Sequence, residues 1–207
     1  MGWRWKDIPQ LLWDIGGKTM ANKVKFGLSN VYISKVTYSG GSYTYGTPFA
    51  LKGAVNLTLD PEGDSADFYA DNTKYFTAAN NQGYSGSLEI ALISDEFRTT
   101  ILGEQTDSNG ALFESKDDTI SDFALGFQID GDTANRRFWL YNVSAARPST
   151  SSQTIEASKE PVTDTLNITA TARLTDGKVK VFMERTEANK TAYNGFFSAV
   201  YEATPSA

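Results

Sequence analysis

The chain has 207 residues, a formal net charge of −6, and neither cysteine nor histidine. Their absence excludes disulfides, zinc centres built from these residues, and Ser–His or Cys–His catalysis. The length fits one domain with its own core, and the acidic balance disfavours tight binding to phosphate backbones. No stretch approaches the roughly 18 apolar residues that span a membrane.

Residues 1–19 differ in composition from the rest of the chain. They hold three of the four tryptophans and end in a Gly-Gly-Lys-Thr run before Met20. The residues that would share one face of a short helix are Trp5, Ile8, Leu12 and Ile15. We interpret residues 1–19 as a leader or extension containing a short helix; the alternative is an interaction or membrane-surface helix. The run is not a phosphate loop, because Leu12 stands where the loop needs its first glycine.

Beyond Met20 the apolar residues alternate with period two, which predicts β-strands. The alternating stretches are Val24–Leu28, Val31–Tyr38, Val55–Leu59, Leu88–Leu92, Phe123–Ile129, 136–143, Leu166–Ala172 and Val179–Met183. Turn residues between several of them predict hairpins. Residues 20–207 are therefore expected to form one mainly β domain, a sandwich or small barrel with both faces partly buried.

One segment departs from this alternation and predicts a helix. Ser94 is a suitable N-cap, Asp95 and Glu96 would occupy the first turn, and Gly103 would end the helix. Phe97 and Ile101 are four residues apart and would face the core. The polar stretch 146–161 is interpreted as a crossing loop or an arm.

Residues 60–83 are acidic and rich in aromatic side chains. Calcium binding of the EF-hand type is disfavoured. An EF-hand loop needs glycine at its sixth position and glutamate at its twelfth. In a loop that began at Asp60, these positions would hold Ser65 and Asp71. A solvated acidic loop is the preferred interpretation of the carboxylates. The aromatic residues suit either sugar stacking or burial between subunits. The candidate interface residues are Asp64, Asp67, Phe68, Tyr69, Asp71, Tyr75 and Phe76.

Several segments, in order along the chain, resemble the major tail protein of phages with long, non-contractile tails. They include "YGTPFALKGAVNLTLDPEGDSADFYADN", "GYSGSLEIALISDEFRTTILGE", "RRFWLYNVSAARPS" and "YNGFFSAVY". The resemblance covers essentially residues 20–204, and none of these segments is a catalytic fingerprint.

The resemblance implies a tail-tube fold, a β-sandwich with one flanking helix and extended arms. It also implies a structural virion protein whose hexameric rings stack into a hollow tube that delivers DNA without binding it specifically. Expected partners are further copies of the chain, a tape-measure protein, and tail-terminator and tail-tip proteins. Assembly would occur in the cytoplasm of a bacterial host, and no membrane anchor, catalysis, metal or cofactor is expected. The alternative is a carbohydrate-binding β-sandwich module of a tail tip or adhesion protein.

Overall fold

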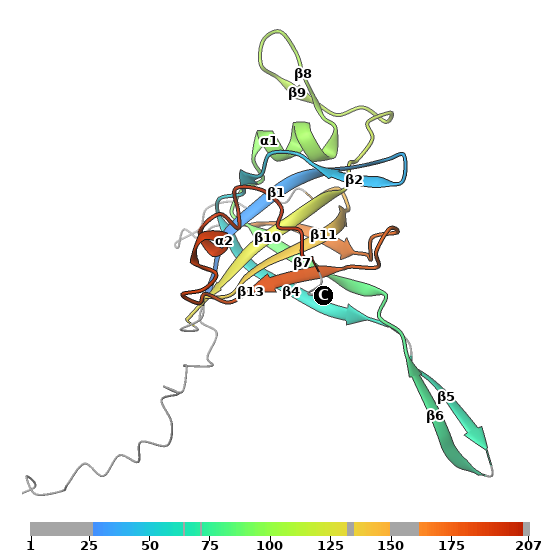
Figure 1. The fold of residues 1–207 in the computed structure, drawn as a ribbon. Helices are drawn as coiled ribbons and strands as arrows, with labels where there is room; N and C mark the ends of the chain where they lie inside the picture. The colour runs from blue at the N-terminus through green and yellow to red at the C-terminus, as the bar shows by residue number, and fades with distance from the viewer. Residues whose placement is uncertain (1–26, 64, 71, 132–134, 150–161, 205–207) are drawn as a thin grey trace, which may run out of the picture.

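The computed structural model describes residues 27–63, 65–70, 72–131, 135–149 and 162–204. Within them the fold is mainly β, as predicted, with one large antiparallel sheet and few helices (Figure 1). In hydrogen-bonding order its strands are β2 (Ser42–Tyr45), β1 (Gly27–Ser39), β10 (Phe123–Asp130), β11 (Arg137–Ala145), β12 (Asp164–Ala170), β7 (Gly83–Ile90) and β4 (Ala54–Glu62).

Two short strands complete the nine-stranded sheet. β3 (Phe49–Ala50) pairs with β1, and β13 (Lys180–Met183) pairs with β11. Two separate ribbons leave the body: β5 (Ser65–Ala70) with β6 (Thr73–Ala79), and β8 (Gln105–Thr106) with β9 (Leu112–Phe113).

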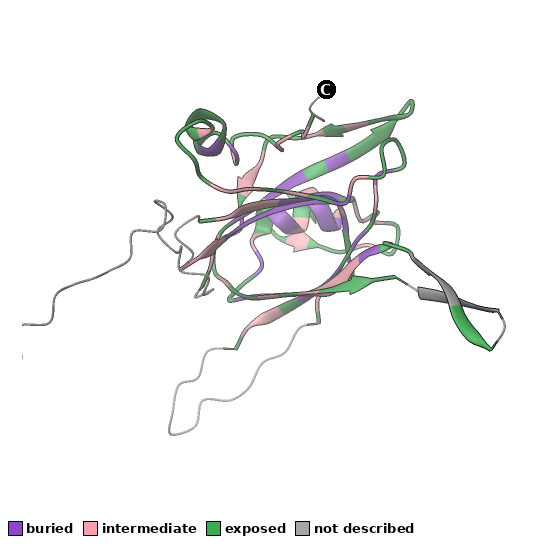
Figure 2. Cartoon of the chain, turned by 60° about the horizontal axis from the view of Figure 1, so that its bottom comes forward, coloured by how far each residue is buried: buried purple, intermediate pink, exposed green. Residues whose placement is uncertain are grey.

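One face of the sheet encloses the larger apolar core. Its inward side chains come from alternate positions of distant strands, as period-two patterning requires. Fully buried members include Ile33, Leu88, Leu125 and Leu166. The buried residues follow the strands and the helix in Figure 2. The sheet and helix together therefore form the scaffold from which the ribbons project.

The opposite face carries a second apolar cluster, which the C-terminal segment covers. Trp139 and Phe196 are buried there with Val36, Ala124 and Val200. Because both faces of the sheet are covered, the predicted two-sided burial is confirmed. Helix α2 (Lys190–Asn194) leads into this covering segment and was not predicted, since five residues are too few to show a helical period.

The predicted helix is confirmed with both of its ends. It consists of α1 (Asp95–Phe97) followed by a π-helical turn, η1 (Arg98–Leu102). The Ser94 side chain accepts a hydrogen bond from the Phe97 N–H, and Gly103 ends the helix with φ of 82°. The change to π geometry was not predicted, because Phe97 and Ile101 are spaced for an ordinary α-helix.

Two predicted strand ends are wrong. β7 ends at Ile90 and Leu92 is 72% exposed, because the chain bends away from the sheet to reach the helix. β12 ends at Ala170 rather than at Ala172. The predicted strand at 24–28 is described only from Gly27 onward; the predicted leader at 1–19, and all but the first few residues of the connection at 146–161, lie outside the described residues.

β12 and β13 are neighbours in sequence but do not pair with each other. Both lie along the same strand, β11, with Val143 opposite Ala170 and Trp139 opposite Val181. The sheet therefore divides beyond β11. One branch consists of β12, β7 and β4, and the other ends in β13.

Candidate functional site

The most prominent external feature is the arm, the ribbon of β5 and β6 (Figure 1). It continues the β4–β7 pair away from the body, and within the described part of the chain each of its strands pairs only with the other. A two-stranded ribbon without further packing is marginally stable in water. The arm is therefore suited to become ordered against a second molecule.

Five of the predicted interface residues lie on the arm. Phe68 and Phe76 occupy directly opposite positions of β5 and β6, and Asp67 lies opposite Thr77. The register shifts after Phe68, so that Tyr69 lies opposite Lys74. Tyr75 stands at this irregularity, as the extra residue between the paired positions. The remaining two predicted residues, Asp64 and Asp71, lie outside the described residues.

The acidic stretch is not the loop that the sequence analysis preferred. Asp60 and Glu62 lie in β4, and Asp67 lies in β5. Asp60 and Glu62 are two residues apart and both exposed, so they share one face of β4, whereas Asp67 belongs to the arm. In the described ranges no three acidic side chains gather closely enough to hold a metal ion.

The base of the arm is fixed by close backbone packing. The Gln82 N–H donates a 2.9 Å hydrogen bond to the Glu62 carbonyl oxygen where the two strands leave the body. Gly83 has φ of +120°, and a Cβ there would lie 2.0 Å from the Ala170 carbonyl oxygen. Only glycine fits this position without displacement of β12. The direction of the arm is thus set where β7 begins.

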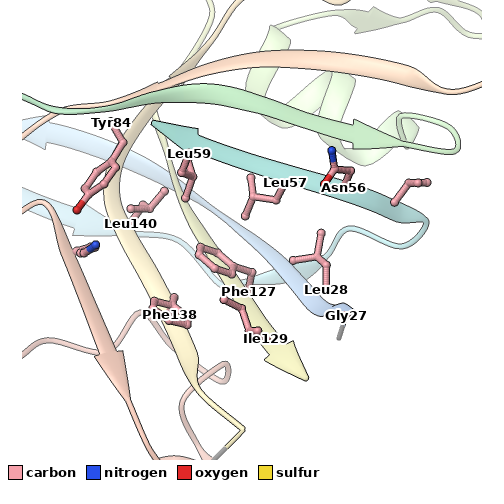
Figure 3. A pocket seen from close by; sticks show the side chains of 12 residues that line it. Gly27, Leu28, Asn56, Leu57, Leu59, Tyr84, Phe127, Ile129, Phe138 and Leu140 are labelled. Atoms are coloured by element: carbon pink, nitrogen blue, oxygen red, sulfur yellow. The ribbon is translucent and has the colours of Figure 1, made fainter. Parts of the chain in front are cut away.

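An apolar cavity of about 490 Å³ lies at the division of the sheet (Figure 3). Leu57 and Leu59 of β4 face Phe127 of β10 and Leu140 of β11 across it. A row of aromatic rings crosses β10, β11 and β13. Phe127 and Phe138 are stacked with their centroids 4.8 Å apart, and the Phe182 ring is tilted against Phe138 at 5.7 Å.

The polar groups at this cavity are few. The polar side chains of the described wall are those of Asn56, Tyr84 and Lys180. Lys180 places its ammonium 4.4 Å from the centre of the Tyr84 ring. Among the described residues, no carboxylate lines the cavity. The arrangement can hold apolar groups. This site was not predicted from the sequence, because its described walls come from six strands and the local signal is ordinary alternation.

A charged cluster binds the C-terminal segment to the body. Arg173 is 6% exposed and contacts Asp176 at 2.5 Å and Glu202 at 2.7 Å. Its guanidinium also donates to the Tyr45 hydroxyl at 3.1 Å and lies 4.4 Å from the centre of the Tyr141 ring. The sequence analysis did not predict this cluster, because its members are far apart along the chain.

The cluster changes the ionisation of its members. Hydrogen bonding by Arg173 lowers the pKa of Asp176 to about 2. Burial raises the pKa of Tyr45 to about 12, although the nearby Arg173 opposes that rise. Every charged member has an opposite partner within contact distance, which indicates a structural role for the cluster.

No protein-family model matches the chain, and no curated protein matches it. Among solved structures, it is similar to a chain of "Cryo-EM structure of the anti-feeding prophage (AFP) baseplate, 6-fold symmetrised", with 10% identity and a TM-score of 0.38. The match covers 77% of this chain and 97% of that chain.

The helices of the described regions were compared in length and hydropathy with a membrane-spanning helix. None of them is long and apolar enough to cross a bilayer.

Proposed function

We propose that this protein is a structural subunit of a phage-type tail tube. Its copies form hexameric rings, and the rings stack into a hollow tube that carries DNA to the host. The observation that carries this proposal is the arm, an aromatic ribbon that extends from a mainly β body (Figure 1). The ordered resemblance of residues 20–204 to major tail proteins supports the same role.

The arm suits the contact between successive rings. A stacked tube needs heterologous contacts, in which one patch meets a different patch of the next copy. A ribbon that leaves the body can reach such a patch, and aromatic residues are enriched where protein surfaces meet. Phe68 and Phe76, at opposite positions of the ribbon, are the proposed anchors.

The outer edge of β2 suits contacts within a ring. β2 ends the sheet and pairs only with β1 among the described strands. The rings of Tyr38 and Tyr43 lie 4.7 Å apart between centroids there, with their planes tilted by 43°, and Tyr38 is 49% exposed. A strand edge with exposed aromatic rings supports pairing with a neighbouring copy.

The charge of the chain agrees with passage of DNA. A net charge of −6 opposes the phosphate contacts that dominate non-specific binding. We further propose that the protein is not an enzyme, and that it meets tape-measure, terminator and tip proteins at the ends of the tube. The virion tail is the proposed location, after assembly in the bacterial cytoplasm.

Electron microscopy of the full chain across a concentration series tests this proposal. We expect rings and hollow tubes for the wild type. Phe68→Ser with Phe76→Ser should retain rings but lose tubes, because only the arm is changed. Phe113→Ser is the matched control, since Phe113 is an exposed aromatic residue on the other ribbon. Monomers at every concentration, together with glycan binding, would instead support the carbohydrate-binding module.

A further inference from the structure

β4 has an open edge beside the apolar cavity. Its one partner strand in the described regions is β7, so the backbone groups on its other side have no strand to pair with. No charged residue lies between Ala54 and Leu59. Natural proteins usually protect such an edge with charge or proline, and here Pro61 stands only beyond this stretch. The edge is therefore available for another strand.

The pairing of β1 with β3 shows that the beginning of β1 lies beside the open edge of β4. β1 is antiparallel to β3, with Tyr32 opposite Ala50, and the Leu51 N–H donates a 2.8 Å hydrogen bond to the Val31 carbonyl oxygen. β4 follows β3 along the chain, so it runs beside the beginning of β1. Leu28 of β1 and Val55 of β4 both line the cavity.

The chain that precedes Gly27 has the pattern and length required. In the sequence, Val24 and Phe26 continue the alternation of Leu28, and in an extended strand Lys23 and Lys25 would occupy the other face. Residues 20–26 can extend over roughly 23 Å at about 3.3 Å per residue, which matches the roughly 20 Å of Ala54–Leu59. Gly27 itself lines the cavity, so the segment is covalently held at the place that it would fill.

The cavity also has room for the side chains. Its volume of about 490 Å³ equals roughly sixteen water molecules at about 30 Å³ each. Apolar side chains placed there would cover the side chains of Leu57, Phe127 and Phe138, which is favourable.

We propose that residues 20–26 extend β1 and pair antiparallel with the open edge of β4, with Phe26 and Val24 inserted into the cavity of the same chain. Directly opposite residues share a face, so insertion into the cavity places Phe26 opposite Leu57 and Val24 opposite Leu59. The unshifted β1–β3 register would place Phe26 opposite Asn56, one residue away. The irregularities of β1 near Asn30 and of β4 after Ala54 allow this shift of one residue. The pairing joins β1 to β4 and closes the divided sheet into a barrel. This inference concerns one subunit and does not depend on ring or tube formation.

Cysteine cross-linking of the full chain tests the pairing, and the native absence of cysteine removes any background. Phe26→Cys is combined in turn with Asn56→Cys, Leu57→Cys and Thr58→Cys. We expect an intrachain disulfide in most of the monomer for at least one pair. Phe26→Cys with Thr44→Cys is the control, because Thr44 is exposed on β2, the opposite end of the sheet. No intrachain bond in any of the three pairs, or bonds only between chains, would overturn the proposal.

A fluorescent apolar dye tests the occupancy of the cavity separately. Val24→Ser with Phe26→Ser should raise dye binding several-fold, because the cavity is opened. Lys23→Ser with Lys25→Ser changes the same segment on its other face and should leave dye binding unchanged. Equal dye binding by the two variants would overturn the proposal, and would point to a small apolar ligand or a second copy as the occupant.

Discussion

Arg173 holds Glu202 through a 2.7 Å contact between Nη1 and Oε1, and so joins the C-terminal segment to the loop after β12. The Tyr141 hydroxyl strengthens this connection by donating to the Tyr201 carbonyl oxygen at 2.9 Å. Lys178 Nζ donates to the Ala203 carbonyl oxygen at 2.7 Å. These polar contacts hold in place the segment that covers the second apolar cluster.

Arg173→Met should lower the free energy of unfolding by about 2 kcal/mol, because the buried guanidinium contacts two carboxylates and an aromatic ring. Urea unfolding followed by circular dichroism measures the change. Leu174→Ala is the control: Leu174 is 78% exposed and adjacent in sequence. Its effect should remain within about 0.5 kcal/mol. Equal effects of the two substitutions would show that the cluster contributes little to stability.

Asp176 should make stability depend on acid pH. Its pKa is lowered from 3.8 to about 2 in the folded chain, mainly by the hydrogen bond from Arg173. The stabilisation is therefore present above the unfolded value and is lost as the pH falls toward 2. Asp176→Asn should flatten the dependence of unfolding free energy on pH between about 5 and 2. Asp117→Asn, at another exposed carboxylate, should leave that slope in place.

Tyr45 should produce the opposite dependence at alkaline pH. Burial raises its pKa from 10.0 to about 12, so the folded state favours the neutral phenol. The stabilisation is present below pH 10 and is lost as the pH rises through the folded value. Tyr45→Phe should reduce the fall in stability across this interval, as measured by thermal unfolding in matched buffers. An unchanged alkaline slope would contradict this role of Tyr45.

Gly83→Ala should disturb the base of the arm. The residue combines φ of +120° with a Cβ position 2.0 Å from the Ala170 carbonyl oxygen. We expect a loss of about 2–3 kcal/mol in unfolding free energy, together with impaired tube formation. Gly110→Ala is the matched control, since Gly110 has φ of +83° and nothing within 4 Å of its Cβ position. The control should show only the smaller cost of the left-handed conformation, about 1 kcal/mol.

Trp139→Phe should weaken the attachment of the C-terminal segment. The indole N–H donates a buried 2.8 Å hydrogen bond to the Phe196 carbonyl oxygen, which would lose its partner. A loss of about 1–3 kcal/mol is expected from the unpaired carbonyl and the smaller ring. Denaturant unfolding measures this loss. Tyr38→Phe, at a 49% exposed ring, should change stability by less than about 0.5 kcal/mol.

Features that depend on neighbouring residues were predicted from the sequence. The alternation of Phe123 to Ile129 and the turn after it gave a strand and its hairpin with β11, because a strand exposes its two faces in turn. Ser94 and Gly103 gave both ends of the helix, because capping groups act within a few residues. Candidate interface residues were placed in the stretch 60–83, although the ribbon that carries them was not predicted.

Features that depend on distant residues were decided only by the tertiary structure. Alternation does not specify that β12 and β13 share β11, or that the sheet divides there and leaves the cavity between Leu57 and Phe127. Nor does it bring Arg173 to Glu202 and Tyr45, whose contact joins three separate parts of the chain. Period two fixes which face a side chain occupies, whereas the partner of that face is fixed by packing of the whole chain.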